Sequence, residues 1–261
     1  MKFKFIGTGT SVGVPQIGCS CPTCTSTDPR DRRRRCGAYV TAGRARFLID
    51  TPPEMREACL EYGIAKVDAV VLTHAHMDHV AGFDDVRRFN TLNGGVPMRC
   101  FAMRETVEAM HRIFPYIGDK PNEKGLFRPM INFVEDDVFS VGTVQLERVR
   151  VEHGFPCCGY LLSERGGARL GYVSDCHDLP DAAVEKFRGA DVMVLNCLRE
   201  REHPTHLDLG RALGYLGRIG PKRAYLIHMC HDLAHGQWLA RLDGSGVSPA
   251  YDGLELTVGQ E

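Results

Sequence analysis

The run His74-Ala75-His76-Met77-Asp78-His79 has the residue types and spacing best suited to chemistry, because it places four potential metal ligands within six residues. Burying such side chains together without a cation would leave several donors and acceptors unpaired, at roughly 1–3 kcal/mol each. Imidazole nitrogens and carboxylate oxygens suit zinc, manganese or iron. The run therefore predicts a metal centre, and its ligand number favours two ions roughly 3.5–4 Å apart that share a bridging carboxylate.

Apolar segments with the character of buried strands lead to further candidate ligands. Four of them run to His74, His153, Asp175 and His228, and they cover Ala69–Thr73, Val144–Val151, Arg169–Ser174 and Ala224–Ile227 in that order. Layered α/β folds build their sites from polar groups at the ends of strands. The pattern therefore predicts an α/β fold in which these residues converge.

The other segments outline a single domain over residues 1–261, since no linker or repeat divides the chain. The apolar start of the chain predicts a first strand. Helical patterns cover Pro53–Glu61, Arg104–Phe114, Pro180–Phe187 and Leu207–Ile219, with Asp181 and Asp208 in first turns and Gly189 and Gly220 after the ends. We expect Tyr116–Arg128, which is rich in Gly, Pro, Lys and Asn, to form a mobile loop beside the site.

Composition narrows the class of protein. A formal net charge of -1 gives the molecule no overall attraction to nucleic acid or to acidic membranes. No apolar stretch reaches the roughly 18 residues that a membrane span needs, and the apolar start is too short for a signal peptide, so we expect a cytoplasmic protein. The cysteine count of 11 is odd, which argues against a disulfide framework and predicts that cysteines such as Cys59, Cys100 and Cys197 are reduced core residues.

The run Thr73–His79, followed by Gly82, resembles the signature of the metallo-β-lactamase-fold hydrolases. The resemblance extends over nearly the whole chain and implies a four-layered αβ/βα sandwich. It further implies that His74, His76 and His153 hold one metal ion and that Asp78, His79 and His228 hold the other. Asp175 would bridge the two ions, which would be zinc or manganese.

A second resemblance concerns the N-terminal segment, which reads Gly7-Thr8-Gly9-Thr10-Ser11, Gly13-Val14-Pro15 and Gly18-Cys19-Ser20-Cys21-Pro22-Thr23-Cys24. These motifs are similar to those of the PhnP-type phosphodiesterases, a family that includes the cyclic-phosphate phosphodiesterase of the carbon–phosphorus lyase pathway. The resemblance implies a third, structural zinc held by Cys19, Cys21, Cys24 and His231, and a possible homodimer. The alternative is that the three cysteines are reduced core residues.

His206 lies in Pro204-Thr205-His206-Leu207-Asp208, at the expected start of a helix. The resemblance implies that this histidine faces the substrate phosphate or protonates the leaving oxygen, with Asp208 as a candidate to orient it, and imidazole suits proton transfer at neutral pH. A helix-capping role is the alternative. With Asp78 and Asp175, His206 completes the predicted catalytic set.

Several charged residues have no clear role in the sequence. The run Arg32-Arg33-Arg34-Arg35 could guide a phosphorylated substrate or nucleic acid, but a solvated loop is the simpler expectation. For the remaining histidines we expect surface positions, and these are His111, His177, His203 and His235.

The function predicted from these residues is hydrolysis of a small phosphodiester, such as a ribosyl cyclic phosphate, by a dinuclear metal centre. One alternative is a nuclease of the tRNA 3′-processing kind, although the neutral charge makes a nucleic-acid partner unfavourable. Another is hydrolysis of a thioester or lactone by the same metals. A metal-binding module without catalysis is the non-enzyme alternative.

Overall fold

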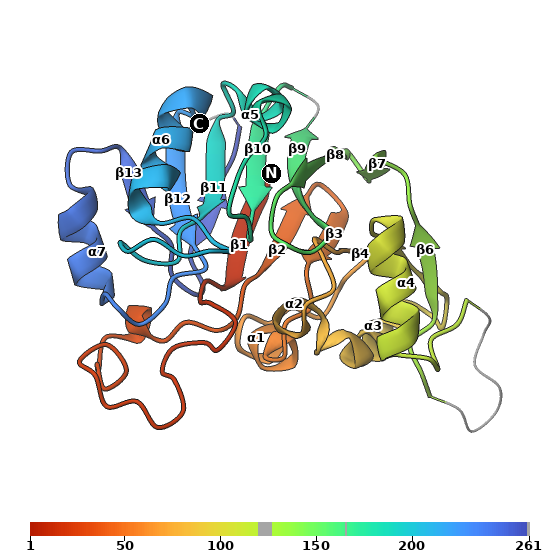
Figure 1. Cartoon of the computed structure of the whole chain (residues 1–261). Helices are drawn as coiled ribbons and strands as arrows, with labels where there is room; N and C mark the ends of the chain where they lie inside the picture. Colours follow the sequence, from red (N-terminus) through yellow and green to blue (C-terminus); the bar gives the residue numbers. More distant parts are fainter. Residues whose placement is uncertain (120–126, 165, 260–261) are drawn as a thin grey trace.

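Two seven-stranded β-sheets form the centre of the protein (Figure 1). The computed structural model describes residues 1–119, 127–164 and 166–259. The first sheet has the order β14-β1-β2-β3-β4-β5-β6. Its strands, in chain order from β1 to β6 and then β14, are Lys2–Gly7, Gly37–Ala42, Ala45–Ile49, Ala69–Val71, Met98–Phe101, Ile131–Val134 and Glu255–Thr257.

The second sheet has the order β13-β12-β11-β10-β9-β8-β7. Its strands, from β7 to β13, are Val138–Val141, Val144–Val151, Cys157–Glu164, Arg169–Val173, Val192–Asn196, Arg223–Ile227 and Val247–Pro249. The strands from β10 to β13 run parallel, and β11 is buried at every residue. Such continuous apolar strands are typical of sheets that are covered on both faces.

Helices cover the outer face of each sheet and complete four layers (Figure 1). Helices α1 to α4 pack on the first sheet and α5 to α7 on the second, and they span Met55–Glu61, Met77–Val80, Val86–Leu92, Arg104–Ile113, Asp181–Phe187, Leu209–Ile219 and His235–Leu242. Between the sheets, rings such as Phe3, Phe47, Tyr160 and Tyr172 form a third apolar core. The predicted α/β fold of four layers is therefore confirmed.

Boundaries of the predicted elements shift by one or two residues. Helix α1 begins at Met55 rather than Pro53, and α6 begins at Leu209 rather than Leu207. Asp208 lies before α6 as its N-cap, where its carboxylate accepts a hydrogen bond from the Arg211 backbone N–H at 3.0 Å. Gly220 ends the same helix with a φ of 64°, a conformation that glycine adopts without strain.

The two ends of the chain meet at one edge of the first sheet. Strand β14 pairs with β1, and the Met1 amino group donates a hydrogen bond to the Val258 carbonyl at 2.8 Å. In the part of the chain that is described, no helix combines the length and apolar character needed to cross a membrane. Most of the expected loop from Tyr116 to Arg128 lies outside the described residues, so its predicted mobility stays a prediction.

Candidate metal centre and active site

Three histidines form the first group of candidate ligands. His74 follows β4, His76 lies at the start of α2, and His153 follows β8. His76 Nδ1 lies 3.0 Å from His74 Nε2 and 3.4 Å from His153 Nε2. Ligand atoms around a tetrahedral zinc, with bonds of roughly 2.0–2.1 Å, lie about 3.3 Å apart. The three nitrogens therefore have the spacing that a shared cation requires.

Two of these rings form a hydrogen bond through Nδ1, which leaves Nε2 as the nitrogen available to a metal ion. Thr73 Oγ1 lies 3.0 Å from His74 Nδ1, and the Thr205 carbonyl lies 3.0 Å from His153 Nδ1. A histidine that binds a metal commonly donates its second ring N–H in this way, which orients the ring and sets its tautomer. Both Nε2 atoms are thus directed toward His76.

Asp78, His79, Asp175 and His228 form a second, more deeply buried group. Asp175 lies 3.0 Å from His79 Nε2 through one oxygen and 2.9 Å from His228 Nε2 through the other. Among the described residues, His79 Nε2, His228 Nε2 and Asp175 Oδ2 are buried, and none of their contacts, those with one another included, has the geometry of a hydrogen bond. Buried polar atoms normally have partners, so this donor set fits a divalent cation.

Asp175 connects the two groups. Its Oδ1 atom also lies 3.9 Å from His153 Nε2, in the first group. Burial raises the pKa of Asp175, but the charges of His228 and His79 outweigh burial and hold it well below its usual range. Burial likewise opposes protonation of His228, whereas Asp175 and Asp78 raise its pKa to about 9. The carboxylates therefore attract positive charge to this place, as protons or as metal ions.

Asp50 is a component of the site that sequence reasoning missed. It follows β3, and its Oδ2 atom lies 2.8 Å from His79 Nδ1 and accepts a hydrogen bond from Thr73 Oγ1 at 2.9 Å. Because Thr73 in turn contacts His74, one buried carboxylate orients a histidine of each group. Leu48-Ile49-Asp50 has the same form as the other strand ends and could have indicated this role.

His206 lies beside Asp175 but is not oriented by Asp208, which caps α6 instead. Its Nδ1 atom lies 3.4 Å from Asn196 Nδ2 and 3.7 Å from Asp175 Oδ1. The amide of Asn196 can only donate through that nitrogen, so Nδ1 accepts and the proton resides on Nε2. Burial and the nearby His228 lower the pKa of His206 to about 2, which keeps its ring neutral.

The cysteine group lies apart from the histidines and joins a long loop to the segment after β12. Cys19, Cys21 and Cys24 place their sulfur atoms 3.3, 3.5 and 3.4 Å from His231 Nδ1. Sulfur and nitrogen ligands of one tetrahedral zinc lie about 3.5 Å apart. The Cys24 backbone N–H donates to Cys21 and lowers the pKa of that thiol to about 7, which favours the thiolate that binds metals.

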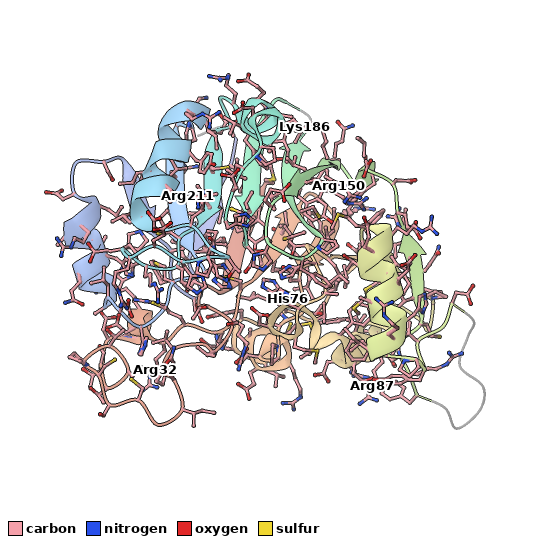
Figure 2. All side chains as sticks on the ribbon, viewed as in Figure 1. Arg32, His76, Arg87, Arg150, Lys186 and Arg211 are labelled. Atoms are coloured by element: carbon pink, nitrogen blue, oxygen red, sulfur yellow. The ribbon has the colours of Figure 1, made fainter. Side chains whose placement is uncertain are left out.

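We expected the run Arg32–Arg35 to form a solvated loop, but the side chain of Arg33 is fully buried. Arg33 donates to the backbone carbonyls of Cys230 and Leu233, at 2.6 and 2.9 Å, on either side of His231. Arg34 and Arg35 form ion pairs with Glu61 and Glu54. Figure 2 places Arg32 at the rim of the molecule, away from the central His76. The run therefore anchors the cysteine loop and offers no free cluster of cations to a substrate.

The four unassigned histidines are not all at the surface. His111 is exposed, and His177 and His203 are partly buried. His235 is buried at 3% exposure, where its backbone N–H donates to Asp31, so its expected surface position is wrong. Cys59, Cys100 and Cys197 are buried, as predicted.

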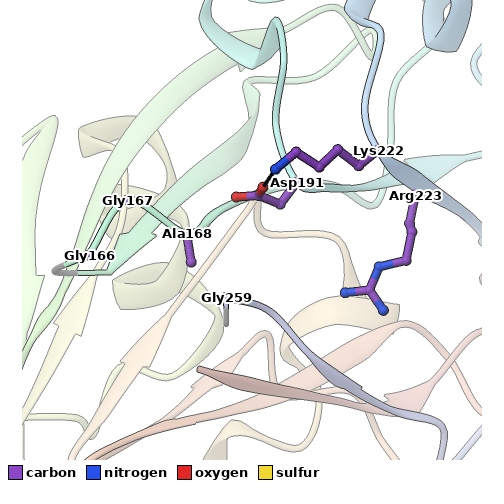
Figure 3. Close-up of a pocket in the computed structure, with 7 residues that line it drawn as sticks. All are labelled: Gly166, Gly167, Ala168, Asp191, Lys222, Arg223 and Gly259. Carbon is purple, nitrogen blue, oxygen red and sulfur yellow. Dashed lines mark ion pairs between the residues drawn. The ribbon is translucent and has the colours of Figure 1, made fainter. Parts of the chain in front are cut away.

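A hollow of about 490 Å³ lies at the opposite ends of β10, β11 and β12 (Figure 3). Its two cations are engaged, because Lys222 pairs with Asp191 at 2.7 Å and Arg223 donates to the Thr257 carbonyl at 2.6 Å. Both cations of the hollow are therefore already paired, and the hollow lies at the strand ends opposite the candidate metal ligands.

Comparison with known proteins places this geometry in a family. The family model for a beta-lactamase superfamily domain matches residues 45–229. The structure resembles Zn²⁺-bound PqqB from Methylobacterium extorquens (TM-score 0.77, 19% identity, 98% of this chain and 100% of that one). It also resembles the short form of human tRNase Z (TM-score 0.71, 15% identity, 100% of both chains). At these identities the last two likenesses concern the fold alone. The protein is a metal-dependent hydrolase of the metallo-β-lactamase fold.

A more similar structure narrows this class. It is the crystal structure of a new diphosphatase from the PhnP family, with a TM-score of 0.88 and 34% identity over 100% of this chain and 99% of that one. The chain belongs to the PhnP family. It is also 32% identical, over its whole length, to an octanoyltransferase from Porphyromonas gingivalis, but it spans only about half (52%) of that protein.

Proposed function

We propose that this chain is a dinuclear metal phosphodiesterase that hydrolyses small phosphodiesters, including cyclic ribosyl phosphates. The observation that carries the proposal is the position of Asp175, which lies within 4 Å of both histidine groups and of His206. Two ions that share a carboxylate can clamp a phosphoryl group between an attacking and a leaving oxygen. Membership of the PhnP family supports the same chemistry.

The proposed ligands are distributed over three ions. His74, His76 and His153 would hold one catalytic ion, zinc or manganese. Asp78, His79 and His228 would hold the second, with Asp175 between the two. When bound, such ions supply Lewis acidity, which lowers the pKa of water and neutralises charge on phosphoryl oxygens. Cys19, Cys21, Cys24 and His231 would hold a structural zinc.

Asp78 and His206 are partly exposed beside the buried members of the proposed centre. The Asp78 side chain is 11% exposed, compared with 2% for Asp175, so Asp78 is the carboxylate that can accept a hydrogen bond from the attacking water. His206 presents its Nε2–H to the phosphoryl group. An anionic phosphate beside His206 opposes the depression of its pKa, and the protonated ring can then give its proton to the leaving alkoxide.

The test uses bis(p-nitrophenyl) phosphate and protein loaded with manganese or zinc. We expect release of p-nitrophenolate that Asp175→Ala abolishes. An absence of diesterase activity together with turnover of an acyl thioester or a lactone would contradict the proposal. Metal analysis of the purified protein tests the ligand sets, and clearly fewer than three ions per chain would argue against the structural zinc.

A second candidate is hydrolysis of a diphosphate bond, and it is favoured by the similarity of this chain to a diphosphatase of the PhnP family. The two reactions differ in the leaving group, because a phosphate leaves without a proton whereas an alkoxide needs one. His206→Ala should therefore slow cleavage of a cyclic alkyl phosphate by about 10²-fold and affect a dinucleoside diphosphate much less. Wild-type protein that cleaves only the diphosphate would favour this second candidate.

A further inference from the structure

Phe155 is an exposed aromatic ring at the rim of the candidate active site. It lies two residues after His153, in the connection between β8 and β9, and 39% of it is exposed. Its ring centroid lies 5.0 Å from that of His76, with the planes inclined by 32°. His76 itself lies in the middle of the molecule, between the helices that cover the two sheets (Figure 2). A large apolar ring that stays accessible beside polar groups is available to a ligand.

The backbone holds this ring in place. Gly154 has a φ of +77° and open space around it, so the chain turns there at no steric cost and directs Phe155 outward. Pro156 restricts the backbone of the residue before it to extended conformations. The Glu152 backbone N–H donates to the Asp178 carbonyl at 3.1 Å and ties down the start of the connection. Among the described residues, His76 is the only ring that Phe155 contacts.

Phe155 is also the end of a row of five rings. Successive centroids from Phe155 through His76, His153 and His206 to His203 lie 5.0, 5.2, 5.0 and 5.2 Å apart. The inner three rings are proposed metal ligands or the proposed proton donor. In an in-line displacement the attacking water lies opposite the leaving oxygen, so the substituent that stays on phosphorus extends sideways from that line. With the leaving oxygen at His206, Phe155 is the exposed ring beside the proposed ligand His76 that this substituent can contact.

We propose, on the basis of the proposed phosphodiesterase function, that Phe155 stacks against a flat aromatic ring on the retained substituent of the substrate. A nucleobase or an aryl group has this shape, and the substrate class would be a nucleoside-like or aryl phosphodiester. Stacking of a base on an aromatic side chain is sequence-tolerant, because every base has a π-face.

The first test compares two esters that share one leaving group. Thymidine 5′-(p-nitrophenyl phosphate) retains a nucleoside on phosphorus, whereas methyl p-nitrophenyl phosphate retains only a methyl group. We expect Phe155→Leu to lower the ratio of kcat/KM for the nucleoside ester to that for the methyl ester by about tenfold. Phe155→Trp should preserve that ratio. Equal losses on both esters would show that Phe155 only supports His76, and an unchanged ratio would also overturn the proposal.

Phe127→Leu is the matched control, because it makes the same change at another exposed ring. Phe127 is 55% exposed and lies under the guanidinium of Arg87, which Figure 2 places far from His76. The ratio of the two kcat/KM values should be the same as in the wild type. A similar fall in this control would contradict a specific role for Phe155.

A second readout does not depend on catalysis. The chain has a single tryptophan, Trp238, which is fully buried, so Phe155→Trp adds one accessible fluorophore. Thymidine 5′-monophosphate should quench the added fluorescence at concentrations where methyl phosphate does not. Equal effects of both phosphates would overturn the stacking role. Quenching in protein that hydrolyses neither ester would refute the proposed phosphodiesterase function and leave the ring-binding site supported.

Discussion

The histidine and aspartate groups take their candidate ligands from the ends of β4, β8, β10 and β12 and from helix α2, whereas the cysteine group takes three of its four from one loop. That loop, residues 8–36, contains only a three-residue 3₁₀ helix, Pro29–Asp31. Five of the seven candidate ligands in the first region are buried, with His76 exposed and Asp78 partly exposed, whereas in the cysteine group only Cys24 is buried. The first region is positioned largely by packed strands, and the second by an irregular loop that Arg33, Arg34 and Arg35 tie to the rest of the chain.

The contrast assigns different tasks to the metals. Packed strands hold the candidate ligands close together, and their histidine rings donate hydrogen bonds to Thr73 Oγ1, Asp50 and the Thr205 carbonyl, so a catalytic ion would enter a largely preformed site. The cysteine loop has little apolar core of its own, and an ion at the proposed zinc site would contribute directly to folding. Removal of metal should therefore inactivate the first region and disorder the second.

The largest effect is expected from Asp175→Asn. The substitution keeps the volume of the side chain and removes the charge that both histidine groups share, so kcat/KM for bis(p-nitrophenyl) phosphate should fall at least about 10³-fold. Metal content should fall with it, while the far-ultraviolet circular dichroism stays that of the wild type. Asp191→Asn, in the hollow at the opposite strand ends, is the control and should retain both metal and activity.

Asp50→Asn should have an intermediate effect. The amide still fills the space, but it no longer accepts two charge-assisted hydrogen bonds, and the affinity for the catalytic metal should fall about 10–100-fold. Competition with a chromogenic chelator measures this change. An unchanged affinity would mean that the strands alone position His74 and His79.

Cys21→Ser tests the second region. One ion per chain should be lost, and limited proteolysis should cut within residues 8–36 while the sheets stay resistant. Activity should fall by roughly tenfold, because His231 lies three residues after His228 and Arg33 fixes the intervening backbone. Cys59→Ala, a buried cysteine outside the group, should keep the full metal content. Intact resistance to protease in Cys21→Ser would show that the loop holds itself without metal.

The smallest expected effect concerns Asp252, near the C-terminal end of the chain, which contacts both ends of the cysteine loop (residues 8–36). Asp252 accepts hydrogen bonds from the Arg34 backbone N–H and from Thr8 Oγ1, both at 2.7 Å, and burial raises its pKa from 3.8 to about 7. Because the folded pKa exceeds the unfolded one, stability should fall as pH rises from 4 to 7 and then level off, by at most about 1.4 kcal/mol per pH unit.

Urea denaturation between pH 4.5 and 8 measures this dependence. Asp252→Asn should lack the part of the decline that lies below pH 6.5, whereas Asp136→Asn, at an exposed position, should retain it. The same slope in all three proteins would assign the pH dependence to other groups.

Local patterns anticipated the α/β layers and the convergence of the candidate residues at strand ends, whereas the division of those candidates into three groups came from the resemblance to known families. Strands that end in His or Asp, and a dense run such as that from His74 to His79, can be recognised within a few residues. The single domain, the homodimer and the cytoplasmic location stay predictions.

Features created by distant contacts were missed. Asp50 has its role because it accepts a hydrogen bond from His79, 29 positions later in the chain. Arg33 lies inside the molecule, where it donates a hydrogen bond to the carbonyl of Cys230, 197 positions away. Four consecutive arginines suggested a solvated surface, and only the path of the folded chain shows that one of them lies inside. Likewise, the row of rings that begins at Phe155 collects residues from three separate segments.

The meeting of the chain ends has a consequence for modular assembly. Because β14 pairs with β1 and Met1 contacts Val258, a second domain joined to either end would leave the molecule at nearly the same point. A permutant that joins the two ends by a short linker would therefore preserve every strand.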